Sequence, residues 1–322
     1  MQVSDRIGRR MKLHDLHVLM AVVQAGSMSK AAALLNTGQP AISRSIADLE
    51  HAFGVRLLDR DRRGVTPTEY GRALLEGGTA VFDDLRQAVK NIEFLADPTV
   101  GTVRVGSTPF LAATFVSAIV DRLSRRYPRI VFRLVTATTA HAETLHRELT
   151  DRNVDLLITR RSGPMTDERL DYEFLFKDSF SIVVGAKSPL VRRRSIALAD
   201  LMDEPWVLPP PHSVIASVAL EAFRAGGLDY PRATVITEPA DVRISLLATG
   251  RFISIFSDAV LRFSARSPEL KILPIKQTLS QVPVGIVTLK NRTLSPLTQL
   301  FIAGSREVAK QLAEKGAPGT VG

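Results

Sequence analysis

A long amphipathic segment between residues 67 and 97 is the feature that most constrains this chain. Apolar side chains recur there every three or four residues on one narrow face, and they include Tyr70, Leu74, Val81, Leu85 and Ile92. Thr-Pro-Thr-Glu at 66–69 has the form of a capping box with proline at the first helical position. A helix of this length with one apolar seam needs a partner. The preceding segment is too small to cover it, so we expect the same helix of a second chain, with packing on its own domain as the alternative.

This helix divides the chain into residues 1–66, 67–97 and 98–322. After Gly101, segments with strand character alternate with helical ones. Strands are expected at 102–107, 130–137, 154–159, 179–185, 233–238, 252–256, 270–275 and 282–289. Helices are expected at 110–126, 140–150, 214–225, 240–249 and 296–314. This alternation predicts an α/β fold with a mostly parallel sheet covered by helices on both faces.

Composition excludes several classes of function. The 322 residues contain no cysteine, which rules out disulfides, thiol nucleophiles and cysteine-ligated zinc. The six histidines lack metal-ligand spacing, and we find no nucleophile elbow, P-loop, HExxH or G-x-G-x-x-G motif, so we expect neither an enzyme nor a metal or cofactor. The start lacks an apolar signal region, and no apolar run is long enough to cross a bilayer. We therefore expect a cytoplasmic protein, which disfavours an exported binding protein.

The net charge of +9 suits a polyanionic partner, but the first 97 residues carry 13 Lys and Arg against 12 Asp and Glu. A claim of DNA binding there must therefore rest on local geometry. Over residues 39–53, a helical wheel places Ile42, Ile46, Leu49 and Phe53 inward. The opposite face has short side chains and one arginine, at Pro40, Ser43, Arg44, Ala47 and His51.

That face suits a DNA groove. Arg44 can reach guanine or phosphate, Ser43 and Gln39 can bond base edges, and Ala47 can contact a thymine methyl. The preceding short helix would point Ser27, Ser29 and Lys30 at phosphates, as in a helix-turn-helix. A basic cluster, Arg60, Arg62 and Arg63, lies between two β-prone pieces and suits a wing that grips the minor groove or phosphate. A solvated basic loop is the alternative for that cluster.

Three segments of this head carry a family resemblance. LHVLMAVVQAGSMSKAAALL, QPAISRSIADLEHAFGVRLLDR and GVTPTEYG resemble, in order and spacing, the winged helix-turn-helix of LysR-type transcriptional regulators. Met28 and Leu58 depart from the phenylalanine common in that family, and both are core positions. The family does not need the leader before Met11, which makes Met11 a second candidate for the start of the chain.

The resemblance implies an all-α winged helix-turn-helix head, a linker helix that dimerises, and a two-lobed effector domain similar to periplasmic binding proteins. Lobe one would comprise 98–172 plus 276–313, and lobe two 173–275, with the chain crossing near 170–175 and 273–280. It also implies a homodimer that assembles into a homotetramer on a double-stranded dyad operator. An inducer would act by preferring one of two arrangements of lobes and heads.

A ligand in such a domain sits at the carboxyl ends of strands and at helix N-termini. The loops in those positions, 106–109, 136–141, 159–161, 209–213 and 238–241, carry hydroxyls and an arginine. The candidate effector residues are Ser107, Thr108, Thr138, Thr139, Arg160, Pro210 and His212. The alternatives are helix caps for the hydroxyls, a surface salt bridge for Arg160 and a structural role for His212. These side chains favour a small carboxylate or a polyhydroxy metabolite.

Overall fold

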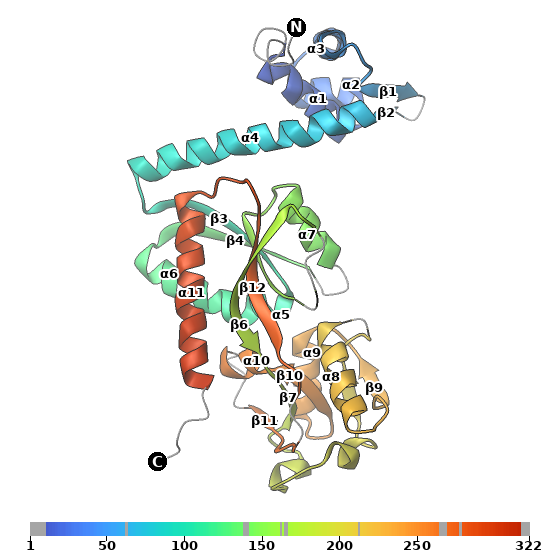
Figure 1. Ribbon diagram of the computed structural model, residues 1–322, viewed down its shortest axis with the longest axis vertical. Coiled ribbons are helices and arrows are strands. Elements are labelled where there is room, and N and C mark those ends of the chain that lie inside the picture. Colours follow the sequence, from blue (N-terminus) through green and yellow to red (C-terminus); the bar gives the residue numbers. More distant parts are fainter. Residues whose placement is uncertain are drawn as a thin grey trace. The chain divides into compact units, whose positions relative to one another are not determined.

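The chain forms two compact units, residues 1–87 and 88–322, which we describe separately. The computed structural model describes residues 11–61, 64–137, 142–161, 163, 167–211, 213–263, 269–276 and 279–316. Figure 1 gives the element labels used below. Within these residues, no helix is both long and apolar enough to cross a membrane.

The first unit begins with three helices and a hairpin. These elements are α1 (Leu13–Ala25), α2 (Met28–Leu34), α3 (Gln39–Phe53), β1 (Leu58–Asp61) and β2 (Gly64–Pro67). Gly26 and Gly54 end α1 and α3 in the left-handed conformation, with φ of 68° and 72°, which glycine adopts without steric cost. The side chain of Ser27 caps α2 by accepting a hydrogen bond from the Lys30 N–H. These elements confirm the predicted three helices, and the β-prone pieces pair as an antiparallel hairpin.

Helix α4 (Glu69–Ala96) starts later than the sequence suggested. Thr66 and Pro67 pair with Asp59 and Leu58 in the hairpin, so the predicted capping box at Thr66 is wrong. Thr68 caps the helix instead: its hydroxyl accepts from the Gly71 N–H at 3.0 Å and donates to a carbonyl in the preceding loop. Thr66 is therefore part of strand β2, and Thr68 is the residue that caps α4.

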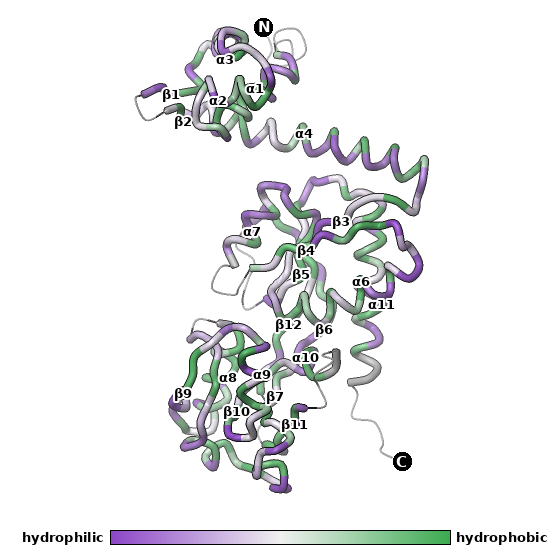
Figure 2. The backbone as a smooth tube through the Cα atoms, turned by 180° about the vertical axis from the view of Figure 1, so that it is seen from behind, coloured by the Kyte–Doolittle hydropathy of each residue, from purple (hydrophilic) through white to green (hydrophobic). Residues whose placement is uncertain are grey.

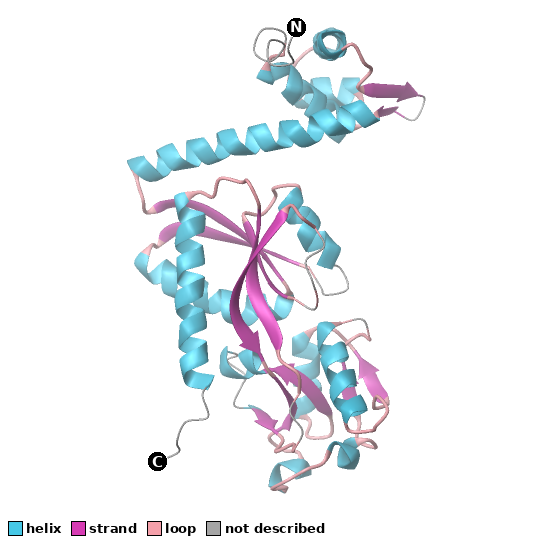
Figure 3. Cartoon of the chain, viewed as in Figure 1, coloured by secondary structure: helices cyan, strands magenta, loops and turns pink. Residues whose placement is uncertain are grey.

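The second unit contains two five-stranded sheets. The first has the order β4 (Arg129–Thr136), β3 (Val100–Ser107), β5 (Leu156–Arg160), β12 (Val282–Leu289), β6 (Leu170–Asp178). The second has the order β11 (Leu270–Ile272), β7 (Phe180–Gly185), β10 (Ile253–Ser257), β8 (Trp206–Leu208), β9 (Ala233–Ile236). Figure 3 shows β6 and β12 running side by side toward the second sheet.

The prediction of a mostly parallel sheet is confirmed, because four of the five strands in each sheet run in one direction and a single strand runs against them. In the first sheet β4, β3 and β5 are parallel, but β12 is antiparallel to both of its neighbours. In the second sheet β8 pairs in parallel with β9 and β10, whereas β7 pairs antiparallel with β10 and β11. The reversal follows from the two crossings between lobes, because β6 leaves the first sheet and β12 returns to it.

The lobe boundary also differs from the prediction. Strand β6 runs to Asp178 in the first sheet, and β7 begins at Phe180 in the second, so the chain crosses at Ser179 rather than at 170–175. Ile275 still belongs to the second lobe, where it bridges to Ile196. Lobe one therefore extends from β3 through Asp178 and resumes with β12, and lobe two spans 180–275.

Helices cover both faces of each sheet. Lobe one has α5 (Pro109–Leu111), which continues through a π turn (Ala112–Val116) into α6 (Ser117–Arg126), and also α7 (Ala142–Thr150) and α11 (Pro296–Gly316). Lobe two has α8 (Val214–Ala225), α9 (Ala240–Ala248), α10 (Asp258–Phe263) and short 3₁₀ turns at 189–192 and 198–201. Separate apolar clusters lie on the two sides, around Phe115 and Leu149 in lobe one and around Trp206 and Phe256 in lobe two. Figure 2 shows hydrophobic stretches along the strands of both sheets.

Candidate functional sites

Helix α3 presents a polar, small-residue surface. Ile42, Ile46 and Leu49 are fully buried, as the helical wheel predicted. Gln39, Pro40, Arg44, Ala47 and His51 are exposed, and Ser43 is half-buried. The helix begins at Gln39, one residue before the proline that was expected to start it. The face opposite the core is therefore available to a partner along the whole helix.

The start of α2 lies next to the start of α3. The Ser29 hydroxyl donates to Gln39 Oε1 at 3.0 Å, which links two of the candidate DNA-contacting residues. Lys30 is exposed on α2, and Arg60 is exposed on the hairpin strand β1. Arg62 and Arg63 lie outside the described residues. Positive and hydrogen-bonding groups thus occur on α2, α3 and the hairpin, the three parts that a winged helix-turn-helix applies to DNA.

The apolar seam of α4 is largely exposed within one chain. Tyr70, Val81, Leu85 and Ile92 are exposed, and the exposed fraction reaches 66% at Ile92. Leu74 is half-buried and packs on the core of the first unit. Leu95, which shares the predicted apolar spacing, and Val89, which was not predicted, are also exposed apolar side chains. Figure 2 shows hydrophobic and hydrophilic residues alternating along this helix.

A cavity of about 330 Å³ lies between the two lobes. Lobe one contributes the start of the helix at Pro109 and the end of β5, and lobe two contributes the loop after β8 and the starts of α8 and α9. Its lining residues are Thr108, Pro109, Phe110, Arg160, Pro209, Ser213, Val214, Ile215, Glu238 and Pro239. This position, at strand ends and helix N-termini, is the one expected for a ligand of a two-lobed α/β domain.

Only some of the predicted effector residues line this cavity. Thr108 lines the cavity, and its buried hydroxyl has no hydrogen-bond partner in the described part of the chain. Ser107 does not line the cavity; its hydroxyl donates to the Ile158 carbonyl at 2.8 Å. Pro210 is replaced on the wall by Pro209, one residue earlier. Thr138, Thr139 and His212 lie outside the described residues.

Arg160 is a buried residue of the cavity wall, so the surface salt bridge considered for it is wrong. Its Nε and Nη2 donate to Asp178 Oδ2 at 2.9 and 2.6 Å, and Nη2 also donates to the Ser257 hydroxyl at 3.1 Å. Asp178 ends β6 of lobe one and Ser257 ends β10 of lobe two. Arg160 therefore joins the lobes, while its Nη1 makes no hydrogen bond to the described residues.

Arg243 was not anticipated from the sequence. It lies on α9 with an exposed fraction of 0%, and its Nη1 donates to the Ile255 carbonyl at 3.0 Å. Nε and Nη2 have no partner among the described residues. The guanidinium carbon lies 4.7 Å from the ring centre of Phe110 and 4.4 Å from that of Phe256. The available signal was an arginine between Val242 and Ile244, where a buried helix face would carry an apolar residue.

The environment of Arg243 disfavours its charge. Burial and, to a smaller extent, the positive charge of Arg160 lower the pKa of Arg243 to about 10, while the charge of Glu238 acts in the opposite direction. The side chain remains a cation at neutral pH, held between two aromatic rings. Buried polar groups without partners are uncommon in folded proteins and call for an explanation.

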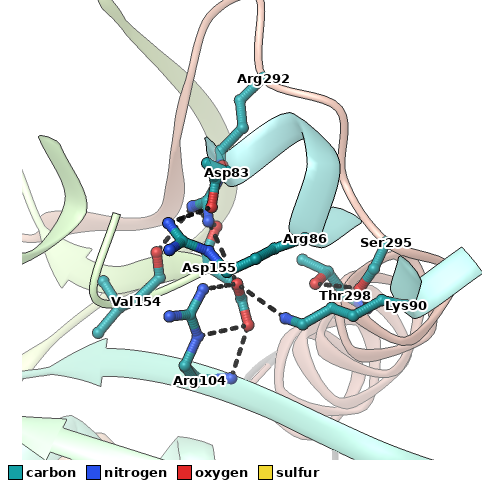
Figure 4. Close-up of polar contacts among 9 residues, drawn as sticks. All are labelled: Asp83, Arg86, Lys90, Arg104, Val154, Asp155, Arg292, Ser295 and Thr298. Carbon is teal, nitrogen blue, oxygen red and sulfur yellow. Dashed lines mark hydrogen bonds and ion pairs between the residues drawn. The ribbon is translucent and has the colours of Figure 1, made fainter. Parts of the chain in front are cut away.

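A second buried charge cluster surrounds Asp155, at the start of β5 (Figure 4). Arg104 donates to both carboxylate oxygens, at 2.6 Å from Nη2 and 3.4 Å from Nε, and its backbone N–H donates at 2.9 Å. Arg292 Nη2 lies 3.3 Å from Oδ1 and Lys90 Nζ lies 3.5 Å from it. Lys90 is on α4, so this carboxylate fastens the end of α4 to lobe one. No pattern in the sequence pointed to this cluster.

A winged helix-turn-helix head, a long helix with an exposed apolar seam and a two-lobed domain with an inter-lobe cavity define a class of ligand-responsive DNA-binding regulators. Residues 13–72 match the model of the bacterial regulatory helix-turn-helix protein, lysR family. Residues 96–310 match the LysR substrate binding domain. The chain therefore belongs to the LysR family of transcriptional regulators, which are not enzymes. The family resemblance read from the sequence is confirmed.

Relatives match along nearly the whole chain. It is 27% identical to GbpR of Azospirillum brasilense over 92% of this chain and 86% of that protein. It is 26% identical to PcaQ of Agrobacterium fabrum over 95% of this chain and 97% of that protein. The solved structure of CbnR is 22% identical, and the match covers 92% of this chain and 100% of that chain with a TM-score of 0.54. The structure of a full-length OxyR variant of Pseudomonas aeruginosa is 18% identical, and the match covers 93% of this chain and 95% of that chain with a TM-score of 0.63. These structures support the fold.

Proposed function

We propose that this regulator acts in the cytoplasm by inserting α3 into the major groove of a double-stranded dyad operator. Gln39, Pro40, Ser43, Arg44 and Ala47 would contact base edges and the groove floor. Phosphate and minor-groove contacts would come from α2 and the hairpin, through Ser27, Ser29, Lys30, Arg60, Arg62 and Arg63. The observation that carries this proposal is the exposed face of α3, where Arg44 is surrounded by short side chains opposite a fully buried core face.

The same proposal includes a homodimer formed along α4 that assembles into a homotetramer. Tyr70, Leu74, Val81, Leu85 and Ile92 would form the seam between two copies. Support comes from the exposure of four of these five apolar residues in the single chain. Water contact along such a face is unfavourable, by about 25 cal/mol for each Å² of apolar surface, and pairing removes it.

The inter-lobe cavity is the proposed effector site, with Thr108 and Arg160 among its contacts. The predicted Ser107 has its hydroxyl engaged within lobe one, so it supports the site only by holding the loop before Thr108. A ligand held between lobes favours the arrangement in which both lobes contact it, and this preference is how binding alters the DNA-bound state. Of the two predicted ligand classes, the mainly apolar wall favours the carboxylate over the polyhydroxy metabolite.

Gel-shift titration on the DNA upstream of the protein's own gene tests the head. Replacing Arg44 by alanine should reduce the preference for this DNA over random duplex by about 5- to 150-fold, since a bidentate base contact contributes about 1–3 kcal/mol. Arg44→Lys separates two roles: lysine replaces a phosphate contact but not a bidentate guanine contact. Arg251→Ala, which removes an exposed charge from lobe two, is the control. Wild-type preference in Arg44→Ala would remove α3 from the reading surface.

A further inference from the structure

The cavity wall is mostly apolar. Its apolar members are Pro109, Phe110, Pro209, Val214, Ile215 and Pro239. Of the polar members, Ser213 already uses its hydroxyl to accept a hydrogen bond from the Ala216 N–H at 3.2 Å. A polyhydroxy compound would leave most of its hydroxyls without partners on such a wall, which is unfavourable, whereas an apolar body is desolvated there without loss.

One part of the wall suits an anionic group. Thr108, Ser213 and Pro239 are the capping residues of three helices, and the helix that begins at Pro109 continues to Arg126. Their N-terminal ends therefore meet at the cavity, and each carries partial positive charge. Thr108 adds a second, independent feature, because the residue is buried and lines the cavity, and its hydroxyl has no partner among the described residues. The Thr108 hydroxyl can therefore donate a hydrogen bond to a ligand oxygen.

Two guanidinium groups stand on opposite lobes beside this wall. Arg160 of lobe one lines the cavity and is paired with Asp178. Arg243 of lobe two does not line the cavity, but its guanidinium lies over the ring of Phe110, which does. The positive charge of Arg160 lowers the pKa of Arg243, so each cation disfavours the other, although Asp178 offsets part of the charge of Arg160. Glu238, on the cavity wall, offsets Arg243 only in part and would repel a second anionic group.

We propose that the effector is a small monocarboxylate with an apolar body, whose carboxylate lies at Thr108 and Arg160 and offsets the repulsion between Arg160 and Arg243. The inference rests on the proposed function, in which this cavity is the effector site. Arg243 acts through space and through Phe110 rather than by direct contact, so it is a positioning and selecting residue. Ligand binding thereby favours the arrangement in which the two lobes lie together.

Calorimetric titration and thermal unfolding of the full-length protein test this. The probes are phenylacetate, isovalerate and hexanoate, each compared with its neutral amide, together with succinate and glucose. At least one monocarboxylate should bind about 10- to 100-fold more tightly than its amide, the range that a charged hydrogen bond provides. Succinate and glucose should leave the melting temperature unchanged. Equal binding of every acid and amide, or no binding of any monocarboxylate, would overturn the ligand class.

Matched arginine variants test the selecting role. In Arg243→Met the preference for acid over amide should fall by about tenfold or more, because the buried cation is gone. Arg251→Met removes an arginine that also lies over a phenylalanine of lobe two but is exposed, and it should keep the wild-type preference. Equal preference in the two variants would refute the role of Arg243. Thr108→Val should weaken acid binding while leaving the melting temperature of the free protein unchanged or raised, since its hydroxyl bonds to nothing in the described fold.

A cavity-filling variant separates failure of the ligand class from failure of the proposed site. Val214→Trp places a large side chain in the cavity from the first turn of α8. If succinate or glucose stabilises the wild type and Val214→Trp abolishes the effect, the monocarboxylate inference is wrong and the effector site stands. If a monocarboxylate stabilises Val214→Trp as much as the wild type, the cavity is not the site and both proposals fail.

Discussion

Replacing Asp155 by asparagine is the perturbation that the structure predicts most sharply. The side chain is 2% exposed and is surrounded by Arg104, Arg292 and Lys90 (Figure 4). Asparagine keeps the volume but removes the negative charge, so three cations are left facing one another around a neutral amide. The Arg292 side chain is 1% exposed and cannot turn outward to water.

The size of the effect follows from that burial. Removing one partner of a buried ion pair destabilises a protein by about 3–5 kcal/mol, because the remaining charge is uncompensated. Arg104 and Lys90 retain some water contact, with 23% of each side chain exposed, so the lower half of this range applies. In a domain of 150–250 residues, 1 kcal/mol corresponds to about 2–4 °C in Tm. We therefore expect Asp155→Asn to lower the Tm of the effector-domain transition by about 6–16 °C.

The loss of stability in Asp155→Asn should depend on pH. Burial alone would raise the pKa of Asp155, but the hydrogen bonds and charge of Arg104 and the charge of Lys90 outweigh it and hold the pKa below its ordinary value. A carboxylate with a lowered folded-state pKa contributes stability that is present above its unfolded pKa, about 3.9, and is lost as pH falls through the folded value. The difference between wild type and variant is thus full at pH 7 and shrinks below about pH 4.

Thermal and urea unfolding at pH 7 and in acid give the measurement. The matched control is Asp121→Asn, since Asp121 forms an exposed i,i+4 pair with Arg125 on α6, and water screens such a pair so well that it contributes little to stability. The reasoning is refuted if Asp155→Asn costs no more than the control at pH 7. A difference from wild type that persists undiminished well below the folded-state pKa would contradict the electrostatic origin.

Two further predictions concern α4. A Cβ at Gly71 would lie 2.1 Å from the Leu57 carbonyl oxygen, so Gly71→Ala should destabilise the head by about 1–3 kcal/mol or more in urea unfolding. The control is Gly77→Ala, which has open space around it and should stabilise the helix by up to about 1 kcal/mol. Leu85→Glu should convert the dimer to a monomer at micromolar concentration in sedimentation velocity, while Glu93→Lys, outside the seam, should not; a dimeric Leu85→Glu protein would contradict the α4 interface.

Local patterns predicted the head well. The buried positions of α3 follow from the helical period alone, and the glycines that end α1 and α3 sit where the period stops. Thr66 and Thr68 were harder to distinguish, because both precede an acidic residue and either can cap a helix. The pairing of Thr66 with Asp59 in the hairpin decided between them, and that pairing depends on a strand formed elsewhere.

The effector domain shows where local reasoning ends. Strand β6 carries charged residues through its length and was not recognised, because its regularity comes from pairing with β12, more than a hundred residues later. Ser107 and Thr108 are neighbours of the same chemical type, yet only Thr108 lines the cavity. The position of each hydroxyl is set by the strand end, since Ser107 is the last residue of β3 and bonds across to β5.

The two buried charges that sequence reasoning missed differ in a way that bears on function. The Asp155 carboxylate accepts hydrogen bonds from Arg104 and faces Arg292, so its charge is fully compensated. Such compensation is expected of a buried charge that holds structural elements together. Arg243 has two donor nitrogens without partners, although a serine or carboxylate from a neighbouring strand would have satisfied them. An unsatisfied buried cation reduces stability, and the fold offers no anion to offset its charge fully; an anion bound in the neighbouring cavity would offset that charge through space, without bonding to the two nitrogens. Mutation or a change of pH at the Asp155 cluster should therefore change the stability of the protein. Mutation of Arg243 should instead change the affinity for the ligand.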